Sequence, residues 1–482
     1  MEPHKKNIVI ALMVAMFLGA VEGTVVTTAT PTIVKDLHGF ESISLVFSVY
    51  LLTTAISTPI YGKLSDLYGR VNILCIGIII FLLGSVLCGV SQNMPMLIAF
   101  RALQGLGAGS IFTVTFTIVG DVFTLEEKSK VQGGMNTVWG VASLAGPFLG
   151  GFLIDTLSWH WIFFINLPFG ILSIILLKKS LKENIKKEKH KIDYAGAVVL
   201  SAAMVLLLNI FLSNNTSGMR QIYFISLSTV AVCLLFIIFY FIERKAAEPI
   251  IPFDLFTGTN ILVNSISFLS SAALIGINVY MPIYIQNILG YNPTVSGLAL
   301  APMSVAWLIS SFILGKCIAI YGGKLIIIIS NLILVVSTAL LIIININSSL
   351  IFIILCLCIM GFGMGGAFTT LTIIIQSSVN YQKRGAAVAT NSLLRTIGQT
   401  IGVGLFGSLF NVFIARYFNQ MGINGINSKN LYTAAASGFS VTNEQIKLSL
   451  NSSIHVIVLL LTLLTIICFL LSFVLPRKIK VD

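Results

Sequence analysis

The stretch GKLSDLYGR occupies residues 62–70 and separates two strongly apolar runs. Its two glycines allow a tight turn in which two helices approach closely. Its aspartate can cap the N-terminus of another helix, and its terminal arginine can pair with an aspartate at the end of a later apolar run. These groups would form a latch that must open during a conformational change, made of Gly62, Asp66, Gly69, Arg70 and Asp121.

The apolar runs on either side of this stretch belong to a series of 14. The chain has 482 residues, 56% hydrophobic and only 10% charged, with a mean hydropathy of +0.98, whereas soluble proteins carry about 25% charged residues. Runs of about 18–25 apolar residues predict transmembrane helices, and the alternation of a membrane β-barrel is absent. We therefore expect an all-α integral membrane protein with spans near residues 8–30, 44–62, 71–90, 96–119, 131–155, 161–177, 194–213, 221–242, 260–288, 295–318, 323–345, 349–374, 387–415 and 454–475.

The formal net charge of +12 comes from lysines and arginines in short connections between the apolar runs. These basic connections alternate with connections that are poor in Lys and Arg, as expected when basic loops stay in the cytoplasm. The pattern predicts that both termini are cytoplasmic. It also explains the positive charge by contact with the lipid bilayer, so we expect no nucleic-acid partner. The seven cysteines lie in or beside apolar runs, so we expect neither a disulfide framework nor a metal site.

Two connections divide the chain. The basic run KKSLKENIKKEKHK (residues 178–191) follows the sixth span, and ERKAAEPIIPFDLF (243–256) follows the eighth. We predict a six-helix bundle over residues 1–180, a basic loop with a two-helix insertion over 181–257, and a second six-helix bundle over 258–482 with an exterior loop at about 417–453. The opening stretch has a weak echo in the second bundle, GKCIAIYGGK (residues 315–324), at the matching position after its second span.

Two charges fall inside predicted membrane helices, where an unpaired ionised group is costly. Glu22 lies in VEGTVVTTATP (residues 21–31) of the first span, and Arg101 lies in LIAFRALQGLGAG (97–109) of the fourth. At about 1.5 Å per residue, Arg101 is roughly 7 Å and Glu22 roughly 9 Å below the same face of a core about 30 Å thick. We expect a direct or water-mediated pair, the alternative being an arginine that snorkels to the surface.

Glycines dominate two further stretches. In GVASLAGPFLGG (residues 140–151), small residues permit close packing against another helix and Pro147 kinks the helix; the glycines and proline of interest are Gly146, Pro147, Gly150 and Gly151. In contrast, GFGMGG (361–366) fits a dinucleotide-binding pattern but has no preceding strand, so helix packing is the better interpretation. The sequence holds no G-x-x-x-x-G-K-[ST] motif for ATP.

Polar and aromatic side chains on several spans are candidates for lining a substrate cavity, although such aromatic residues are common as packing or interfacial anchors. We expect Arg395 to face the interior, where it either contacts substrate or holds the structure. The candidates are Thr24, Thr27, Tyr50, Gln104, Asn136, Trp139, Tyr280, Tyr284, Trp307 and Arg395.

Together these motifs resemble those of the major facilitator superfamily, and specifically its 14-helix drug:proton antiporter branch of bacterial multidrug efflux proteins. GKLSDLYGR is similar to the signature loop G-x-L-x-D-x-x-G-R, and GVASLAGPFLGG to the antiporter signature G-x-x-x-G-P-x-x-G-G with Ala142 at its first glycine. EGTVVTTATP resembles the first-helix signature D-x-T-I-V-N-V-A-L-P, with Glu22 for aspartate and Thr27 for asparagine. Further similar stretches lie at residues 192–196, 243–252, 284–302 and 394–402.

The resemblance implies a monomeric transporter of the bacterial cytoplasmic membrane, not an enzyme, that exports lipophilic cationic or zwitterionic drugs such as quinolones, dyes and quaternary ammonium compounds. Export would be driven by proton entry through Glu22 and Arg101, with alternating access by rocking of the two halves and no cofactor beyond the coupling ion. Two transport alternatives are a narrow exporter, of tetracycline–metal complexes or a metabolite, and coupling to Na⁺. A third is a non-transporting membrane sensor or lipid-handling protein.

Overall fold

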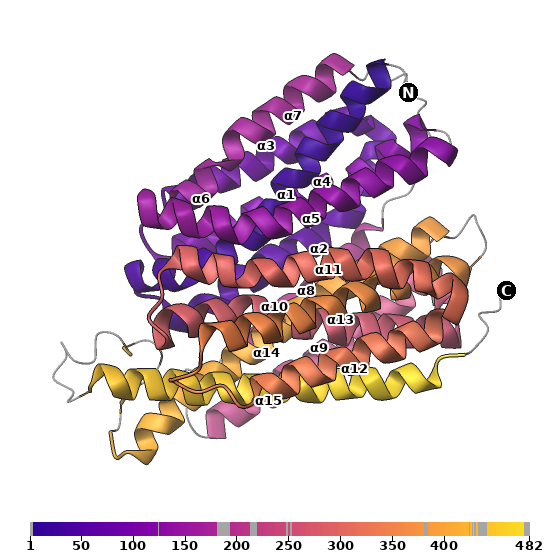
Figure 1. Ribbon diagram of the computed structural model, residues 1–482. Coiled ribbons are helices and arrows are strands. Elements are labelled where there is room, and N and C mark those ends of the chain that lie inside the picture. The colour runs from indigo at the N-terminus through magenta and orange to yellow at the C-terminus, as the bar shows by residue number, and fades with distance from the viewer. Residues whose placement is uncertain are drawn as a thin grey trace.

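The structure is a computed structural model in which every regular element is a helix. It describes residues 3–123, 125–180, 193–212, 219–246, 249–250, 253–379, 384–423, 425–426, 428, 430–431 and 441–476, with some side chains within these helices left out. The long helices lie roughly side by side along one direction (Figure 1).

The first group of helices, up to the basic connection, contains seven elements. They are α1 (Pro3–Asp36), α2 (Ile43–Tyr68), α3 (Arg70–Gly89), α4 (Met94–Val122), α5 (Leu125–Thr156), α6 (Trp161–Phe164) and α7 (Asn166–Ser180). The short α6 and the longer α7 together form one apolar stretch, Trp161–Ser180, that is long enough to cross a membrane.

The remaining helices form a pair followed by a second group. The pair is α8 (Tyr194–Leu212) and α9 (Met219–Lys245), and the second group is α10 (Gly258–Ile283), α11 (Pro293–Tyr321), α12 (Gly323–Leu341), α13 (Leu350–Ser377), α14 (Arg384–Gln420) and α15 (Asn443–Val474). Short 3₁₀ turns occupy Phe40–Ser42 and Phe253–Leu255, and a π-helical segment, Tyr284–Ile288, continues α10.

Helix packing repeats between the two groups. In the first group α1 packs on α5, α2 and α3 pack on α4, and α7 packs on α1 and α3. In the second group α10 packs on α14, α11 and α12 pack on α13, and α15 packs on α10 and α12. Each contact of the first set thus has its counterpart in the second, as expected for two copies of one six-helix unit.

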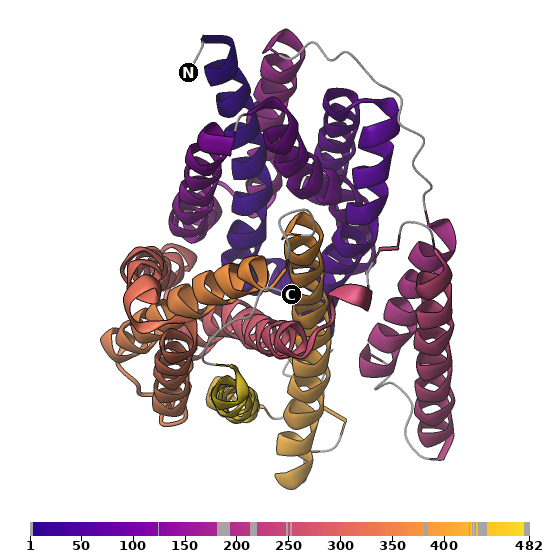
Figure 2. The ribbon, with the colours of Figure 1, turned by 90° about the vertical axis from the view of Figure 1, so that its right-hand side faces the viewer.

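The two groups meet mainly along two helix pairs, α2 with α14 and α5 with α11, which are themselves counterparts in the repeat, and α1 makes smaller contacts with α10 and α11. The α8–α9 pair lies to one side (Figure 2) and contributes apolar side chains to a cluster with α2 and α14. Among the described residues, three residue pairs form hydrogen bonds between the groups at the end where α1 finishes. There Thr294 N donates to Asp155 at 3.0 Å, Gln286 donates to the Thr28 carbonyl at 2.9 Å, and Asn411 to the Glu41 carbonyl at 3.0 Å.

The weak sequence echo is visible in the backbone. Gly69 separates α2 from α3 with φ 92° and ψ 140°, and Gly322 separates α11 from α12 with φ 81° and ψ 152°. These positive φ values are strained for residues with a Cβ but accessible to glycine. The same turn is therefore built twice, at the same place in each repeat.

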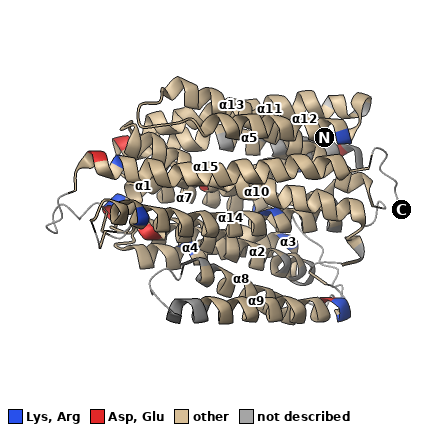
Figure 3. Ribbon diagram, turned by 90° about the horizontal axis from the view of Figure 1, so that it is seen from below, with Lys and Arg blue, Asp and Glu red and all other residues tan. Residues whose placement is uncertain are grey.

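The membrane-spanning prediction agrees with the helices. Thirteen helices of the described residues are long and apolar enough to cross a membrane, and the apolar part of α8, Tyr194–Leu207, is shorter. Charged residues gather at the two ends of the molecule, with few between them (Figure 3). The beginning of α1 and the end of α15 lie at the same end (Figure 1).

The segment between α14 and α15 is shorter than the exterior loop that the sequence predicts at about 417–453. Helix α14 continues to Gln420, and α15 already begins at Asn443. Hydropathy marks only the apolar part of a helix, whereas α15 starts with a polar capping box in which Thr442 and Gln445 exchange hydrogen bonds. Polar helical turns therefore extend beyond the membrane-spanning stretch.

Glycines of the GFGMGG stretch pack α13 against α11, as the sequence predicts. A Cβ at Gly361 would lie 2.0 Å from the Met303 carbonyl oxygen, and one at Gly365 would lie 2.2 Å from the Trp307 carbonyl oxygen. Both obstacles are backbone atoms, so no side-chain rotation can relieve the clash. The close approach of these two helices depends on glycine.

We predict that Gly361→Ala lowers the melting temperature of the purified protein by several degrees, because overpacking of this kind costs about 1–3 kcal/mol. The matched control is Gly315→Ala on α11, where the added Cβ would lie an ordinary 3.6 Å from Thr369. Thermal unfolding in detergent measures both. Equal melting temperatures for the two variants would contradict the packing argument.

Candidate functional site

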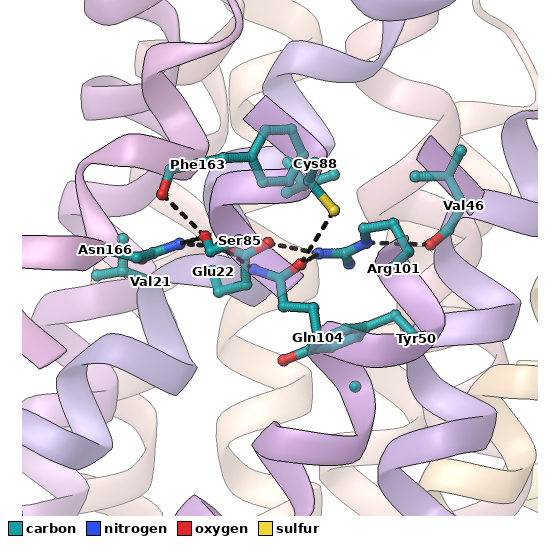
Figure 4. Close-up of polar contacts among 12 residues, drawn as sticks. Val21, Glu22, Val46, Tyr50, Ser85, Cys88, Arg101, Gln104, Phe163 and Asn166 are labelled. Carbon is teal, nitrogen blue, oxygen red and sulfur yellow. Dashed lines mark hydrogen bonds and ion pairs between the residues drawn. The ribbon is translucent and has the colours of Figure 1, made fainter. Parts of the chain in front are cut away.

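Glu22 and Arg101 form an ion pair in the interior of the first helix group. Arg101 Nη1 donates to Glu22 Oε1, and both side chains are about 1% exposed or less. The pair joins α1 to α4 (Figure 4). The depth argument from the sequence therefore predicts the contact correctly, and snorkelling of Arg101 does not occur.

The guanidinium of Arg101 has three further partners. Its Nη1 also donates to Gln104 Oε1 at 2.6 Å, its Nε donates to the Val46 carbonyl at 3.3 Å, and it lies 4.0 Å from the centre of the Tyr50 ring. Gln104 is one turn further along α4, and the other two residues belong to α2. A cation over an aromatic face is stabilised when water is excluded, so Arg101 is held from two helices even apart from Glu22.

The second carboxylate oxygen of Glu22 receives a hydrogen bond from α7. Asn166 Nδ2 donates to Glu22 Oε2 at 2.6 Å and to Ser85 Oγ on α3 at 2.8 Å. Ser85 also accepts from Gln104 Nε2 at 3.2 Å and donates to the Phe163 carbonyl at 2.8 Å. The network therefore closes on itself, because Gln104 contacts both Arg101 and Ser85 (Figure 4).

Asn166 reaches this position because the helix is interrupted between α6 and α7, directly before it. The interruption leaves the Phe163 carbonyl free to accept from Ser85. Neither Asn166 nor Ser85 is among the site residues that the sequence predicts. A serine in an apolar helix commonly donates its hydroxyl to the backbone of its own helix. Nothing in the sequence around Ser85 therefore indicates that it contacts Asn166.

The other predicted residues of the first group bond locally. The Thr24 hydroxyl donates to carbonyls of its own helix and to the Ala142 carbonyl of α5 at 3.3 Å, and Thr27 donates to the Thr24 carbonyl at 2.6 Å. Trp139 Nε1 lies 3.2 Å from the Met16 sulfur. The side chain of Asn136 lies outside the described part of the chain.

The glycine-rich part of α5 contacts two neighbours. A Cβ at Gly146 or Gly150 would meet Thr24 or Val25 on α1, and one at Gly151 would lie 2.5 Å from the Pro293 carbonyl oxygen at the start of α11. The Pro147 carbonyl in turn lies against Gly297 of α11. This helix is thus packed tightly both within its own group and across the boundary to the second.

The four candidate cavity residues of the second group differ in exposure: two tyrosines are fully buried, and Trp307 and Arg395 are half-buried. Tyr280 is 1% and Tyr284 0% exposed; Tyr280 packs on Phe410, and Tyr284 donates its hydroxyl to the Asn345 carbonyl. These two tyrosines pack in the core of the bundle in this structure, and their role as cavity-lining residues stays a prediction. Trp307 and Arg395 are half-buried and meet at the ring of Phe368, described below.

The predicted latch is only partly described. Gly69 makes the turn with positive φ, and Gly62 lies where a Cβ would make an ordinary 3.5 Å contact with Thr113 of α4. Arg70 begins α3. The side chains of Asp66 and Asp121 lie outside the described residues, so the ion pair of the latch stays a prediction.

The chemistry available at Glu22 is proton binding. Within the described residues no group of three or more His, Cys, Asp or Glu side chains could hold a metal ion. Glu22 is the one carboxylate inside the membrane-spanning part of the first group, and its buried charge is balanced by Arg101.

We predict that Arg101→Met destabilises the protein by about 3–5 kcal/mol, because it leaves a buried carboxylate without its counter-charge. The double variant Glu22→Gln/Arg101→Met should recover much of this loss. Lys5→Met is the control, since it breaks the surface pair of Lys5 with Glu127 (2.8 Å), and exposed pairs contribute about 0–1 kcal/mol. Thermal unfolding tests the three; strictly additive losses in the double variant would refute coupling.

Comparison with known proteins agrees with this architecture. Residues 12–403 match the family model described as Major Facilitator Superfamily. The chain is 36% identical to Multidrug resistance protein 3 of Bacillus subtilis, over 85% of this chain and 80% of that protein. It is 31% identical to Multidrug efflux pump SdrM of Staphylococcus aureus, over 89% of this chain and 93% of that protein.

Solved structures show the same fold at low sequence identity. An inward-facing bacterial homolog to the human lysosomal transporter Spinster superposes with a TM-score of 0.70 at 14% identity and covers 98% of both chains. A D-xylose–proton symporter superposes with a TM-score of 0.65 at 13% identity, covering 99% of this chain and 100% of that one. With its repeated six-helix packing and these similarities, the chain belongs to the major facilitator superfamily and is similar to its multidrug efflux transporters rather than to any enzyme.

Proposed function

We propose that this protein is a secondary multidrug efflux transporter that exports lipophilic cationic or zwitterionic drugs in exchange for protons. Relatives at 31–36% identity are named as multidrug resistance, transport or efflux proteins, which supports drug export. The organisms of these relatives support a bacterial cytoplasmic membrane. We place both termini in the cytoplasm because of the basic connections, and the repeated halves within one chain favour a monomer.

The observation that carries the coupling proposal is the setting of Glu22. Both of its oxygens receive N–H donors, from Arg101 and from Asn166, and its side chain is closed off from water. Uptake of a proton removes the carboxylate's charge and weakens both charge-assisted hydrogen bonds. A single protonation therefore changes the contacts of α1 with α4 and with α7 together.

The network keeps partners for the neighbouring groups when Glu22 is protonated. Arg101 retains Gln104, the Val46 carbonyl and the Tyr50 ring, and Asn166 retains Ser85. Alternatively, the Asn166 amide can rotate by half a turn, which gives up the contact of its nitrogen with Ser85 but lets its oxygen accept from the new hydroxyl of Glu22. Buried polar groups left without partners are costly, so these alternative contacts make both protonation states accessible.

The same geometry favours H⁺ over Na⁺ as the coupling ion. A hard cation needs several oxygen ligands around it, whereas the atoms directed at the Glu22 carboxylate are N–H donors. Thr24 directs its hydroxyl to backbone carbonyls, including one on α5, and Thr27 directs its hydroxyl to the Thr24 carbonyl. These two hydroxyls are engaged away from the carboxylate.

Helix α1 links the protonation site at Glu22 to the second helix group. This helix carries Glu22, and six residues further on its Thr28 carbonyl accepts from Gln286, which lies in the π-helical segment after α10. Contacts of α1 with α10 and α11 lie on the boundary between the two helix groups. Alternating access by rocking of the halves would break and remake these contacts, and a charge change at Glu22 would bias that equilibrium.

We predict that Glu22→Gln abolishes drug-induced proton efflux from inside-out vesicles with an imposed pH gradient, because glutamine keeps the hydrogen-bonding shape but cannot bind and release the proton. Ethidium and norfloxacin serve as drugs, and a Na⁺ gradient is tested in parallel. We also expect the Glu22→Gln variant to lose drug transport.

The control is Glu444→Gln, which removes a carboxylate from the first turn of α15, outside the network. It should transport as the unmodified protein does. Unchanged drug-induced proton efflux in Glu22→Gln would overturn the coupling proposal, and transport driven by Na⁺ alone would replace H⁺ as the coupling ion.

A further inference from the structure

The second helix group holds a half-buried cation, Arg395, in a stretch of sequence that has no acids. From residue 255 to residue 443 the sequence contains no aspartate or glutamate, so α10 to α14 carry no carboxylate at all. Arg395 lies on α14, about 11 residues or roughly 16 Å from its start. In the first group the intramembrane arginine has Glu22, but no acid of these five helices can pair with Arg395.

The guanidinium of Arg395 is held in place by neutral contacts. Its Nη2 lies 3.1 Å from Thr372 Oγ1 and 3.4 Å from the Phe368 carbonyl oxygen, both on α13, and its carbon lies 4.5 Å from the centre of the Phe368 ring. Its Nε is buried and has no hydrogen-bond partner among the described residues. The group is therefore oriented but incompletely satisfied, and no acid among the described residues pairs with it.

Trp307 extends this arrangement on α11. Its ring stacks on the Phe368 ring with centroids 5.3 Å apart and an angle of only 6° between planes. Trp307 and Arg395 are both half-buried, whereas Phe368 between them is 7% exposed. The two partly accessible groups thus offer a flat aromatic surface on α11 and a positive fork on α14, and both of these helices pack on α13.

We infer that Arg395, with Trp307 and Phe368, is the binding site for the carboxylate of aromatic substrates. A guanidinium binds a carboxylate through parallel N–H donors, and the head of Arg395 is partly accessible and has no carboxylate partner among the described residues. A planar ring system joined to that carboxylate stacks on the aromatic pair. The ligand's negative charge supplies the neutralisation that α10 to α14 cannot.

This inference rests on the proposed function. It adds that, among the exported drugs, aromatic zwitterions bind through Arg395, whereas simple cations do not. A zwitterion can direct its cationic end toward the half that carries Glu22 and its anionic end toward Arg395. A cation without a carboxylate makes only the first interaction. The two kinds of substrate should therefore depend on Arg395 to different degrees.

The test compares transport of three probes in inside-out vesicles: norfloxacin, its methyl ester, and ethidium. In Arg395→Met we expect norfloxacin transport to fall about tenfold or more at low concentration, the scale of one lost charge-assisted hydrogen bond, while the ester and ethidium are little changed. Arg395→Lys, which keeps the charge but not the fork, should lie in between. Arg416→Met on the same helix is the control for loss of a positive charge.

A second measurement does not depend on the folding of any variant. Norfloxacin and its methyl ester are bound to the unmodified protein and their affinities are compared by tryptophan fluorescence quenching. We expect tighter binding of norfloxacin, and equal affinities would overturn the inference. So would an equal loss of norfloxacin and ester transport in Arg395→Met, or no loss of either.

The outcomes also separate this inference from the proposed function. Export of ethidium but not norfloxacin by the unmodified protein would refute the carboxylate site and leave drug export in place. Export of none of the three probes would refute the proposed function itself.

Discussion

A charge inside the hydrocarbon must be neutralised, and the first helix group is organised around that constraint. Glu22 on α1 and Arg101 on α4 meet at one depth. The other polar groups of the network bind one of these two charged side chains or a residue that does. Asn166 and Ser85 add α7 and α3, while Val46 and Tyr50 add α2. Five membrane helices therefore converge on a single ion pair, so a change in its protonation reaches all of them.

The two halves of the molecule share a packing plan but differ in electrostatics. Counterpart helices make counterpart contacts, and Gly69 and Gly322 make the same turn. The first half nevertheless encloses a balanced pair, whereas α10 to α14 of the second enclose Arg395 and no acid. Because packing is set by small residues and helix lengths, the repeat can be preserved while the charges inside it diverge.

Much of the fold was predictable because membrane helices are marked by composition alone. The apolar runs, their number, and the break between two six-helix units follow from hydropathy and basic connections. The ends of helices were not predictable in this way. Helices α14 and α15 continue into polar sequence at residues 420 and 443, since a helix needs only satisfied backbone groups and a cap once it leaves the apolar region.

The sequence by itself determined which charges lie inside the membrane and at what depth, because position along a helix fixes height at about 1.5 Å per residue. That was enough to pair Glu22 with Arg101. Only the tertiary structure decided which neighbours complete the site, since facing depends on how each helix is rotated and packed. It brought Asn166 and Ser85 to the carboxylate, buried Tyr280 and Tyr284 in the core, and placed Arg395 beside Phe368 without an acid.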